Sequence, residues 1–547
     1  MEYTNGRSPF SRFASVEEIK SSLYKVMLND SNPQFGGVPI YTEKEAVYIE
    51  HTDSHTLTDG GTGAKKTRLI AMPSLVNYIK SGESFIASDP KAELYERMQP
   101  LLKERGYKIF ALNLRDFDKS HCWNPLGFPY SLYRGNNKDK AVELVNDIAC
   151  GIAKDNRSCD PYWHNSAADL FTGLVLVLFE CADKNEINFK SLSALKTQAF
   201  DIVKNDAPFI REYFLDHIEP SAYVRSVLSG TVQVTESTRS CIISTLDTAL
   251  RPFISQEKLL DTLSFNDLDM KNIGNEKTAV FLILPDEHSL YHSLVSVFVK
   301  QCYIELITEA QKHPGKKLPR RINYLLDEFA SLPAIHDFPA MITASRSRNI
   351  RFNLLIQSFN QLNQRYGQEA GTIKGNCEDW IILHSREKET IEELVYLAGN
   401  KSGEEPLISA SVIQTLNKEE GEALVFVKRK HPFITRLLDI DFYPDARIVD
   451  EEAEYPVNNR KAEFVFDFKR FCLNRSGYFL SQLFTGRTHE EILKDRMGRK
   501  NYYSPDEDII LEPLFKSRTP VDEDIKNEVG EVNECCDEVA VEGGDRK

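Results

Sequence analysis

One stretch constrains the fold of this chain most, the segment Ile322–Pro333, which reads INYLLDEFASLP. A short apolar run ends there in two adjacent carboxylates, Asp327 and Glu328. Apolar runs of this length, bounded by charge and proline, are typical of buried strands in an α/β sheet. Acids at the carboxyl end of such a strand lie where open α/β sheets bind ligands. The stretch indicates either a metal–phosphate site with a water-polarising neighbour, or a strand end with a solvated acid pair.

A glycine-rich turn lies roughly 260 residues upstream, between a strand predicted at Thr56–Thr58 and a helix expected to break or kink at Pro73. Glycines let backbone amides face inward, and a helix N-terminus adds partial positive charge, so this order predicts a phosphate-binding loop. A solvent loop is the alternative. Lys66 is expected to reach the β- and γ-phosphates and Thr67 to hold a magnesium ion. The residues expected to cradle a nucleotide are Gly60, Gly61, Thr62, Gly63, Ala64, Lys65, Lys66 and Thr67.

The loop departs from the usual pattern, GxxxxGK followed by serine or threonine, at one position: Lys65 replaces the second glycine. The alternative register takes Lys65 as the phosphate lysine and departs at three positions. It puts Asp59 and Ala64 where glycines belong, and Lys66 where the serine or threonine belongs. We therefore predict that Lys66 contacts the phosphates and that Thr67 holds the magnesium ion. Lys65 must then adopt backbone angles that a glycine normally takes.

Apolar runs alternate with helical patterns over most of the chain, which predicts an α/β fold with a mostly parallel, doubly wound sheet. No sheet strand is evident from Asp139 to about Lys258, where apolar residues recur at helical spacing, so we expect an inserted all-α domain there. A helix is expected near Val16–Met27 and a strand at Ala46–Glu50. The further strands are expected at Thr56–Thr58, Ser84–Ser88, Lys108–Leu114, Thr278–Leu284, Ile322–Asp327, Ile350–Gln357, Asp379–His384 and Glu422–Val427.

The chain is expected to divide into five parts. These are an N-terminal segment (1–50), the sheet domain (51–138 and 259–445), the all-α insertion (139–258), a C-terminal extension (446–519) and an acidic tail (520–547). Short helices are expected in the extension, such as Ala462–Leu473 and Tyr478–Leu483. The tail carries ten acidic and three basic residues, a composition typical of disorder.

No stretch is long and apolar enough to predict a membrane span. The longest apolar run, Leu170–Ala182, is short and is interrupted by Thr172 and Glu180. We therefore expect a cytoplasmic protein, brought to the inner face of the membrane only by a partner. The net charge of −15 argues against a surface that binds nucleic acid all over, although a local basic channel is compatible with it.

Several segments follow one another in a recognisable order. After the glycine-lysine-threonine turn come SDPKAEL, NLRDFDKSHCWNPL, the helical insertion, YLLDEFASLP, SRSRNIRFNLLIQSFNQLNQRYG and GNCEDWIILHS. This order resembles the TraG/TraD class of type IV secretion coupling proteins, the conjugative DNA-transfer ATPases, over roughly Asp53–Tyr443. The resemblance implies a RecA-like P-loop core, an inserted all-α domain and a ring-shaped homo-hexamer. It also implies ATP and Mg²⁺ as cofactors, and DNA, the relaxase of a relaxosome and secretion-channel proteins as partners.

The resemblance assigns roles to the residues at the strand ends. Asp327 falls nearest the metal ion, Glu328 is the expected water activator, and Gln357 matches the family's polar sensor of the γ-phosphate. Arg346 and Arg348, with Arg351, lie in the basic segment SRSRNIR. One of these arginines is expected either to act in trans as an arginine finger or to be a surface cation that caps a helix.

Two functions follow from these observations. The first is an ATPase that couples hydrolysis to DNA transfer and grips DNA mostly at its phosphates, in a salt-sensitive and sequence-tolerant way. The alternative is a non-hydrolysing adaptor that binds nucleotide, or only relaxase and DNA, and recruits substrate to a partner motor. Lys65 in the loop favours the adaptor, whereas the Asp327–Glu328 pair with Gln357 favours the motor. Many members of the class have a membrane-spanning N-terminus, which the sequence does not predict here.

Overall fold

The computed structural model describes residues 10–475, apart from residues 136, 154–160, 205–206, 219, 288 and 447–451. The helix predicted at Tyr478–Leu483 and the acidic tail predicted at 520–547 therefore lie outside the described residues, as does much of the predicted extension.

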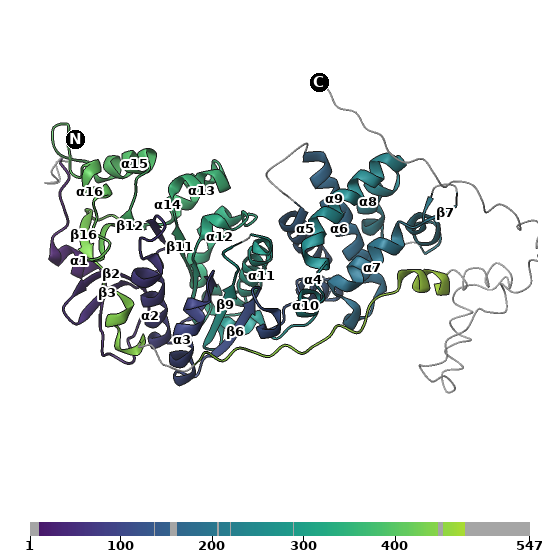
Figure 1. Cartoon of the computed structure of the whole chain (residues 1–547), viewed down its shortest axis with the longest axis horizontal. Helices are drawn as coiled ribbons and strands as arrows, with labels where there is room; N and C mark the ends of the chain where they lie inside the picture. The colour runs from purple at the N-terminus through teal and green to yellow at the C-terminus, as the bar shows by residue number, and fades with distance from the viewer. Residues whose placement is uncertain are drawn as a thin grey trace, which may run out of the picture. The chain divides into compact units, whose positions relative to one another are not determined.

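A nine-stranded sheet forms the core of the described chain (Figure 1). Its strand order is β16-β15-β12-β4-β11-β10-β5-β9-β6. The strands from β12 to β6 are parallel, whereas β15 runs antiparallel to both its neighbours, β12 and β16. The predicted α/β class with a mostly parallel sheet is therefore confirmed. The strands are β4 (Thr56–Gly60), β5 (Ser84–Asp89), β6 (Lys108–Asn113), β9 (Thr278–Ile283), β10 (Ile322–Leu326), β11 (Ile350–Ile356), β12 (Asp379–His384), β15 (Glu422–Val427) and β16 (Phe433–Arg436).

The middle of this sheet is covered by helices on both faces. Every residue of β4, β5, β9, β10 and β11 is buried, which explains why a strand such as β9 is a nearly continuous apolar run rather than an alternating one. Successive side chains point to opposite faces: Phe281 joins the core that contains α2 (Met72–Ser81), and Leu282 joins the core that contains α11 (His292–Ala310). The sheet is therefore a rigid support for the loops at its edges.

The strand order places three loops together. Strands β4, β11 and β10 are adjacent and parallel, so their carboxyl ends lie side by side along one end of the sheet, here called its carboxyl edge. The glycine-rich loop follows β4, Gln357 follows β11, and Asp327 with Glu328 follows β10. This edge is where open α/β sheets bind ligands.

The chain between β6 and β9 is mostly helical, as predicted. In the middle of α6 (Pro161–Cys181), residues such as Leu170, Leu174 and Leu178 are fully buried. A short two-stranded sheet, β7 (Ile202–Lys204) with β8 (Ala207–Pro208), was not predicted. None of the helices in the described ranges is both long and apolar enough to cross a membrane. The helices are α4 (Gly127–Arg134), α5 (Lys138–Ala153), α6 (Pro161–Cys181), α7 (Phe189–Ala199), α8 (Ala222–Val232), α9 (Glu236–Ile254) and α10 (Glu257–Thr262).

The helix predicted at Val16–Met27 is wrong in its second half. Helix α1 (Val16–Ser22) begins at a capping box formed by Ser15 and Glu18, but the backbone turns extended at Leu23. Strand β1 (Tyr24–Met27) then pairs with β3 (Ala46–Glu50). Cross-strand pairing outweighs the local helical pattern here. With β2 (Val38–Glu43), these strands form a separate antiparallel sheet, so the strand expected at Ala46–Glu50 is confirmed.

The helix predicted at Ala462–Leu473 begins too early. Residues 452–467 have no helix or strand, and a helix covers 468–475 (Figure 1, yellow-green). Backbone amides of the extended segment donate to side chains on three different helices. In a helix beginning at Ala462, the amide of Phe466 would instead donate to the carbonyl of Ala462. Glu454 donates to Gln99 of α3 (Glu93–Glu104) over 2.7 Å, Ala462 to Asp261 over 2.8 Å, and Phe466 to Ser191 over 2.9 Å.

Candidate phosphate-binding site

The glycine-rich loop leaves β4 and enters a helix directly. A π-helical turn (Thr67–Ala71) continues into α2, so the irregularity expected around Pro73 is a change of helix type rather than a break. Gly63 has φ +78° and Lys65 has φ +62°. Lys65 therefore has the left-handed backbone that normally favours glycine, as its place in the loop pattern predicts.

The two consecutive lysines of the loop point to different partners. The Lys66 side chain is 8% exposed; its Nζ donates to the carbonyl of Gly60 over 2.5 Å and lies 3.9 Å from Oε1 of Glu328. Nζ of Lys65 instead lies 2.5 Å from Oε2 of Glu419. The geometry thus supports Lys66, rather than Lys65, as the phosphate lysine.

Asp327 and Thr67 face each other across the site. Thr67 Oγ1 donates to Oδ2 of Asp327 over 3.4 Å, and the backbone amide of Glu328 donates to Oδ1 of Asp327 over 3.0 Å. Burial, with the neighbouring Glu328 carboxylate, raises the pKa of Asp327 to about 6. Hydroxyl and carboxylate oxygens are ligands that Mg²⁺ prefers, so the donor set fits this ion.

Gln357 joins the loops of the three adjacent strands. Its Nε2 donates to Oε2 of Glu328 over 2.7 Å, and its Oε1 accepts from Thr62 Oγ1 at 3.5 Å. Glu328 itself has φ +55°, a left-handed conformation that is uncommon for a non-glycine residue and clusters at functional sites. The structure therefore brings together Lys66, Thr67, Asp327, Glu328 and Gln357.

The predicted arginines do not join this cluster. They lie at the amino end of β11 (Ile350–Ile356), on the opposite edge of the sheet from Gln357. Arg346 Nη1 lies 2.9 Å from Glu378 Oε1, and Arg348 donates to a backbone carbonyl before β10. Arg351 is 2% exposed and pairs with Glu83 at 2.8 Å. Because Arg351 is buried within its own subunit, the prediction that it is either a finger or a surface cation is wrong.

Two buried acids near the loop were missed as site residues. Asp59, inside β4, is fully buried, and neither of its carboxylate oxygens has a hydrogen-bond partner among the described residues. Burial raises its pKa well above the ordinary range. Asp89, at the end of β5, accepts from the amide of Tyr95 at 2.8 Å, and burial raises its pKa to about 7. An acid at the end of a predicted strand, as in SDPK, was the available signal.

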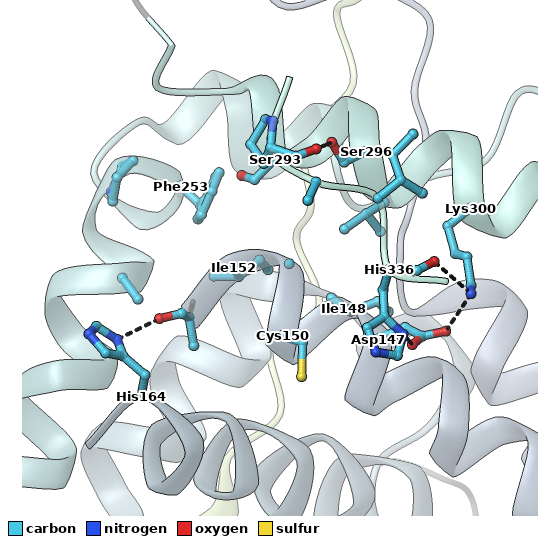
Figure 2. A pocket seen from close by; sticks show the side chains of 18 of the residues that line it. Asp147, Ile148, Cys150, Ile152, His164, Phe253, Ser293, Ser296, Lys300 and His336 are labelled. Atoms are coloured by element: carbon cyan, nitrogen blue, oxygen red, sulfur yellow. Dashed lines mark hydrogen bonds and ion pairs between the residues drawn. The ribbon is translucent and has the colours of Figure 1, made fainter. Parts of the chain in front are cut away.

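A cavity of about 900 Å³ lies away from the phosphate loop, against the segment that follows Glu328 (Figure 2). Helices α5, α6, α9 and α11 and residues of the segment 331–337 line it. Lys300 of α11 donates to the carbonyl of His336 over 2.9 Å and lies 3.0 Å from Asp337 Oδ2. His336 Nδ1 lies 2.9 Å from Asp147 Oδ1 on α5. The segment after Glu328 thus contacts the helical insertion directly.

A glycine-rich loop between a strand and a helix, with its lysine and threonine facing an acidic strand end, defines a P-loop protein of the α/β class. Residues 13–426 match the family model described as Type IV secretory system Conjugative DNA transfer. The match covers most of the chain, and the protein belongs to this family.

Curated relatives are distant in sequence. The type IV secretion system-coupling protein VirD4 of Bartonella quintana is 22% identical over 327 residues, which cover 59% of this chain and 49% of VirD4. The conjugal transfer protein TraG of Escherichia coli is 22% identical over 430 residues, which cover 73% of this chain and 64% of TraG. The chain therefore spans about half to two thirds of the length of these relatives.

Solved structures of the coupling protein TrwB share the fold. The unbound form has a TM-score of 0.55 at 15% identity, covering 84% of this chain and 97% of TrwB. The complex with the non-hydrolysable GTP analogue GDPNP has a TM-score of 0.56 at 16% identity, covering 84% of this chain and 99% of TrwB. The RecA-like P-loop fold expected from the sequence is confirmed by this likeness.

Proposed function

We propose that the protein is an ATPase that couples ATP hydrolysis to the transfer of DNA, or of a relaxase–DNA complex, to a type IV secretion channel. Family membership supports the transfer of DNA. The observation that carries the enzymatic part is the 2.7 Å hydrogen bond from Gln357 to Glu328, with Lys66 3.9 Å from the same carboxylate. A binding-only site has no need for an oriented carboxylate beside its phosphate lysine.

The residues of the site divide the reaction between them. The amides of the loop and Lys66 bind the β- and γ-phosphates of ATP, and Lys66 leaves the Gly60 carbonyl to do so. Thr67 and Asp327 would supply oxygen ligands to Mg²⁺, which would neutralise phosphate charge. Glu328 orients a water and accepts its proton as the water oxygen attacks the γ-phosphorus and ADP leaves. TrwB solved with ADP and Mg²⁺ supports this cofactor choice.

Gln357 is the residue suited to sense whether a γ-phosphate is bound. It is polar, lies at the end of the strand between the loop strand and the acidic strand, and bridges Thr62 to Glu328. A γ-phosphate on the loop competes for the same amide donor, so its presence changes the bond to Glu328.

Movement at Glu328 has a direct route to the helical insertion. The segment 329–337 continues from Glu328 to His336 and Asp337, which contact Asp147 of α5 and Lys300 of α11. This route supports coupling of hydrolysis to the grip on DNA, because the catalytic strand end and the insertion share one short connection.

We propose a homo-hexameric ring as the working form. Arg346 and Arg348 lie at the sheet edge opposite the phosphate loop, so only a neighbouring subunit can present them to a γ-phosphate. In a ring that places the amino ends of one subunit's strands against the phosphate loop of the next subunit, one of these arginines acts as an arginine finger in trans. The protein would act in the cytoplasm, recruited to the inner face of the membrane by a channel protein.

The adaptor remains a second candidate because of Lys65. Its φ of +62° and its ion pair with Glu419 add strain and a fixed cation to the loop. An ATPase assay on the purified chain, with and without single-stranded DNA, separates the two functions. The motor predicts Mg²⁺-dependent phosphate release that rises with DNA, whereas the adaptor predicts nucleotide or DNA binding without release.

A further inference from the structure

A second cavity, of about 250 Å³, lies beside the phosphate loop. Lys65 and Leu69 line it from the loop and its helix, and the segments 418–421 and 436–439 line it from the other side, with Phe442. Strands β15 and β16 run antiparallel, with Glu422 paired to Arg436, so both segments reach the loop edge of the sheet. The cavity therefore adjoins, through Lys65 and Leu69, the loop proposed to hold a nucleotide's phosphates.

The wall of this cavity is fixed to the start of the loop helix. Arg68 follows Thr67 directly, and its Nε lies 2.9 Å and its Nη2 2.5 Å from the two carboxylate oxygens of Asp439. Such bidentate pairs are geometrically specific. The segment that carries Phe442 is thus held next to the residues that follow the magnesium-binding threonine.

Phe442 is an aromatic side chain with no ring partner among the described residues. It is 66% exposed, and no other ring in the part of the chain that the structure describes stacks on it. Exposed aromatic side chains that line a cavity are suitable platforms for a base, because every nucleobase has a π-face.

We infer that this cavity takes the base and ribose of the nucleotide, with the base stacked on Phe442. The inference rests on the proposed function, since it assumes a triphosphate on residues 61–67. The nucleoside must leave the loop past the residues after Thr67, and the space there is this cavity. Cavities for whole small ligands run to roughly 300–1,000 Å³, so one of about 250 Å³ suits part of a nucleotide.

The charges around the cavity indicate weak selection between bases. Lys65 pairs with Glu419, and Arg436 pairs with Glu420, so these groups are engaged with each other. A base held by stacking rather than by a fixed set of hydrogen bonds is recognised without regard to its identity. ATP and GTP should therefore bind with similar affinity.

Calorimetric titration of the full chain with Mg²⁺ and three probes tests the inference: ATP, GTP and inorganic tripolyphosphate, which has no base. Phe442→Ala should weaken ATP and GTP equally, by on the order of ten- to a hundredfold, and leave tripolyphosphate unchanged. Phe442→Tyr should restore both nucleotides. Tyr396→Ala is the matched control, because Tyr396 is 84% exposed on α15 (Lys388–Ala398) and does not line the cavity.

The probes separate two kinds of failure. If tripolyphosphate and ATP both bind the unmodified protein and Phe442→Ala leaves ATP affinity unchanged, the inference is overturned while the phosphate site stands. If neither probe binds the unmodified protein, the proposed function fails and the inference with it. A large preference for ATP over GTP would contradict recognition by stacking alone.

Discussion

Gln357 donates its side-chain amide to the carboxylate of Glu328 over 2.7 Å, which links the ends of two adjacent strands, β11 and β10. The two residues lie 29 positions apart in the chain. Their bond fixes one oxygen of Glu328 and leaves the other 3.9 Å from Lys66. The carboxylate is thereby oriented before any substrate binds.

Removing this amide tests its role directly. Gln357→Ala should lower ATP turnover by roughly a hundredfold, the scale of losing one positioned donor, and change ATP affinity little. Steady-state hydrolysis and equilibrium binding measure the two effects. Gln364→Ala, on the exposed side of α13 (Phe359–Tyr366), is the control and should behave as the unmodified protein.

The two loop lysines should respond in opposite ways. Lys66→Ala removes a charge-assisted contact of about 1.5–3 kcal/mol, so ATP affinity should fall roughly ten- to a hundredfold with loss of hydrolysis. Lys65→Gly should be tolerated, because glycine adopts φ +62° freely, and it should speed hydrolysis. The reverse pattern would assign the phosphate contact to Lys65. Unchanged affinity in both variants would favour the adaptor.

Arg351 should be required for folding rather than for catalysis. Arg351→Met removes the nearer of the two cations beside the buried Glu83, at 2.8 Å, and leaves Arg321 at 3.9 Å; it should lower the free energy of unfolding by up to about 3–5 kcal/mol. Arg348→Ala should change it by less than about 0.5 kcal/mol. Chemical denaturation measures both. A stable Arg351→Met protein would refute the structural role.

Stability should fall as the pH rises from about 4.5 to about 7, partly because of Glu305 on α11. Burial raises its pKa from 4.5 to about 7, so folding takes up a proton between these values and native stability declines across them. Glu305→Gln should remove this decline and stabilise the protein at pH 8 by up to about 3 kcal/mol.

Glu309→Gln, one turn further along α11, is the control with the opposite sign. A hydrogen bond from Lys312 lowers the pKa of Glu309. The stability that Glu309 contributes is therefore present above its unfolded pKa and is lost as the pH falls. If both variants have the same pH profile, burial of Glu305 does not govern the effect.

Much of the sheet could be predicted because its parallel strands are buried on both faces. The strands Asp379–His384 and Glu422–Val427 begin and end at the predicted residues. The positions of the site residues could be predicted because Asp327 and Gln357 end predicted strands and Lys66 follows the glycine-rich turn after another. The likeness to TrwB concerns the fold, so the roles of these residues stay predictions.

Other features depend on partners far away in the sequence. An apolar run does not show which strand it pairs with, so the antiparallel direction of β15 was not predictable. Arg351 looked like a surface cation because its partner Glu83 is 268 residues away. The extended backbone at 462–467 likewise follows from acceptors on distant helices, such as Ser191.

The account depends most on Glu328 as the group that activates water in a hydrolysing motor. Glu328→Gln keeps the size and the hydrogen-bonding capacity of the side chain but removes the proton acceptor. ATP turnover by the full chain, measured with single-stranded DNA and Mg²⁺, should fall at least about a hundredfold while ATP affinity is kept. Turnover near that of the unmodified protein would contradict this central claim.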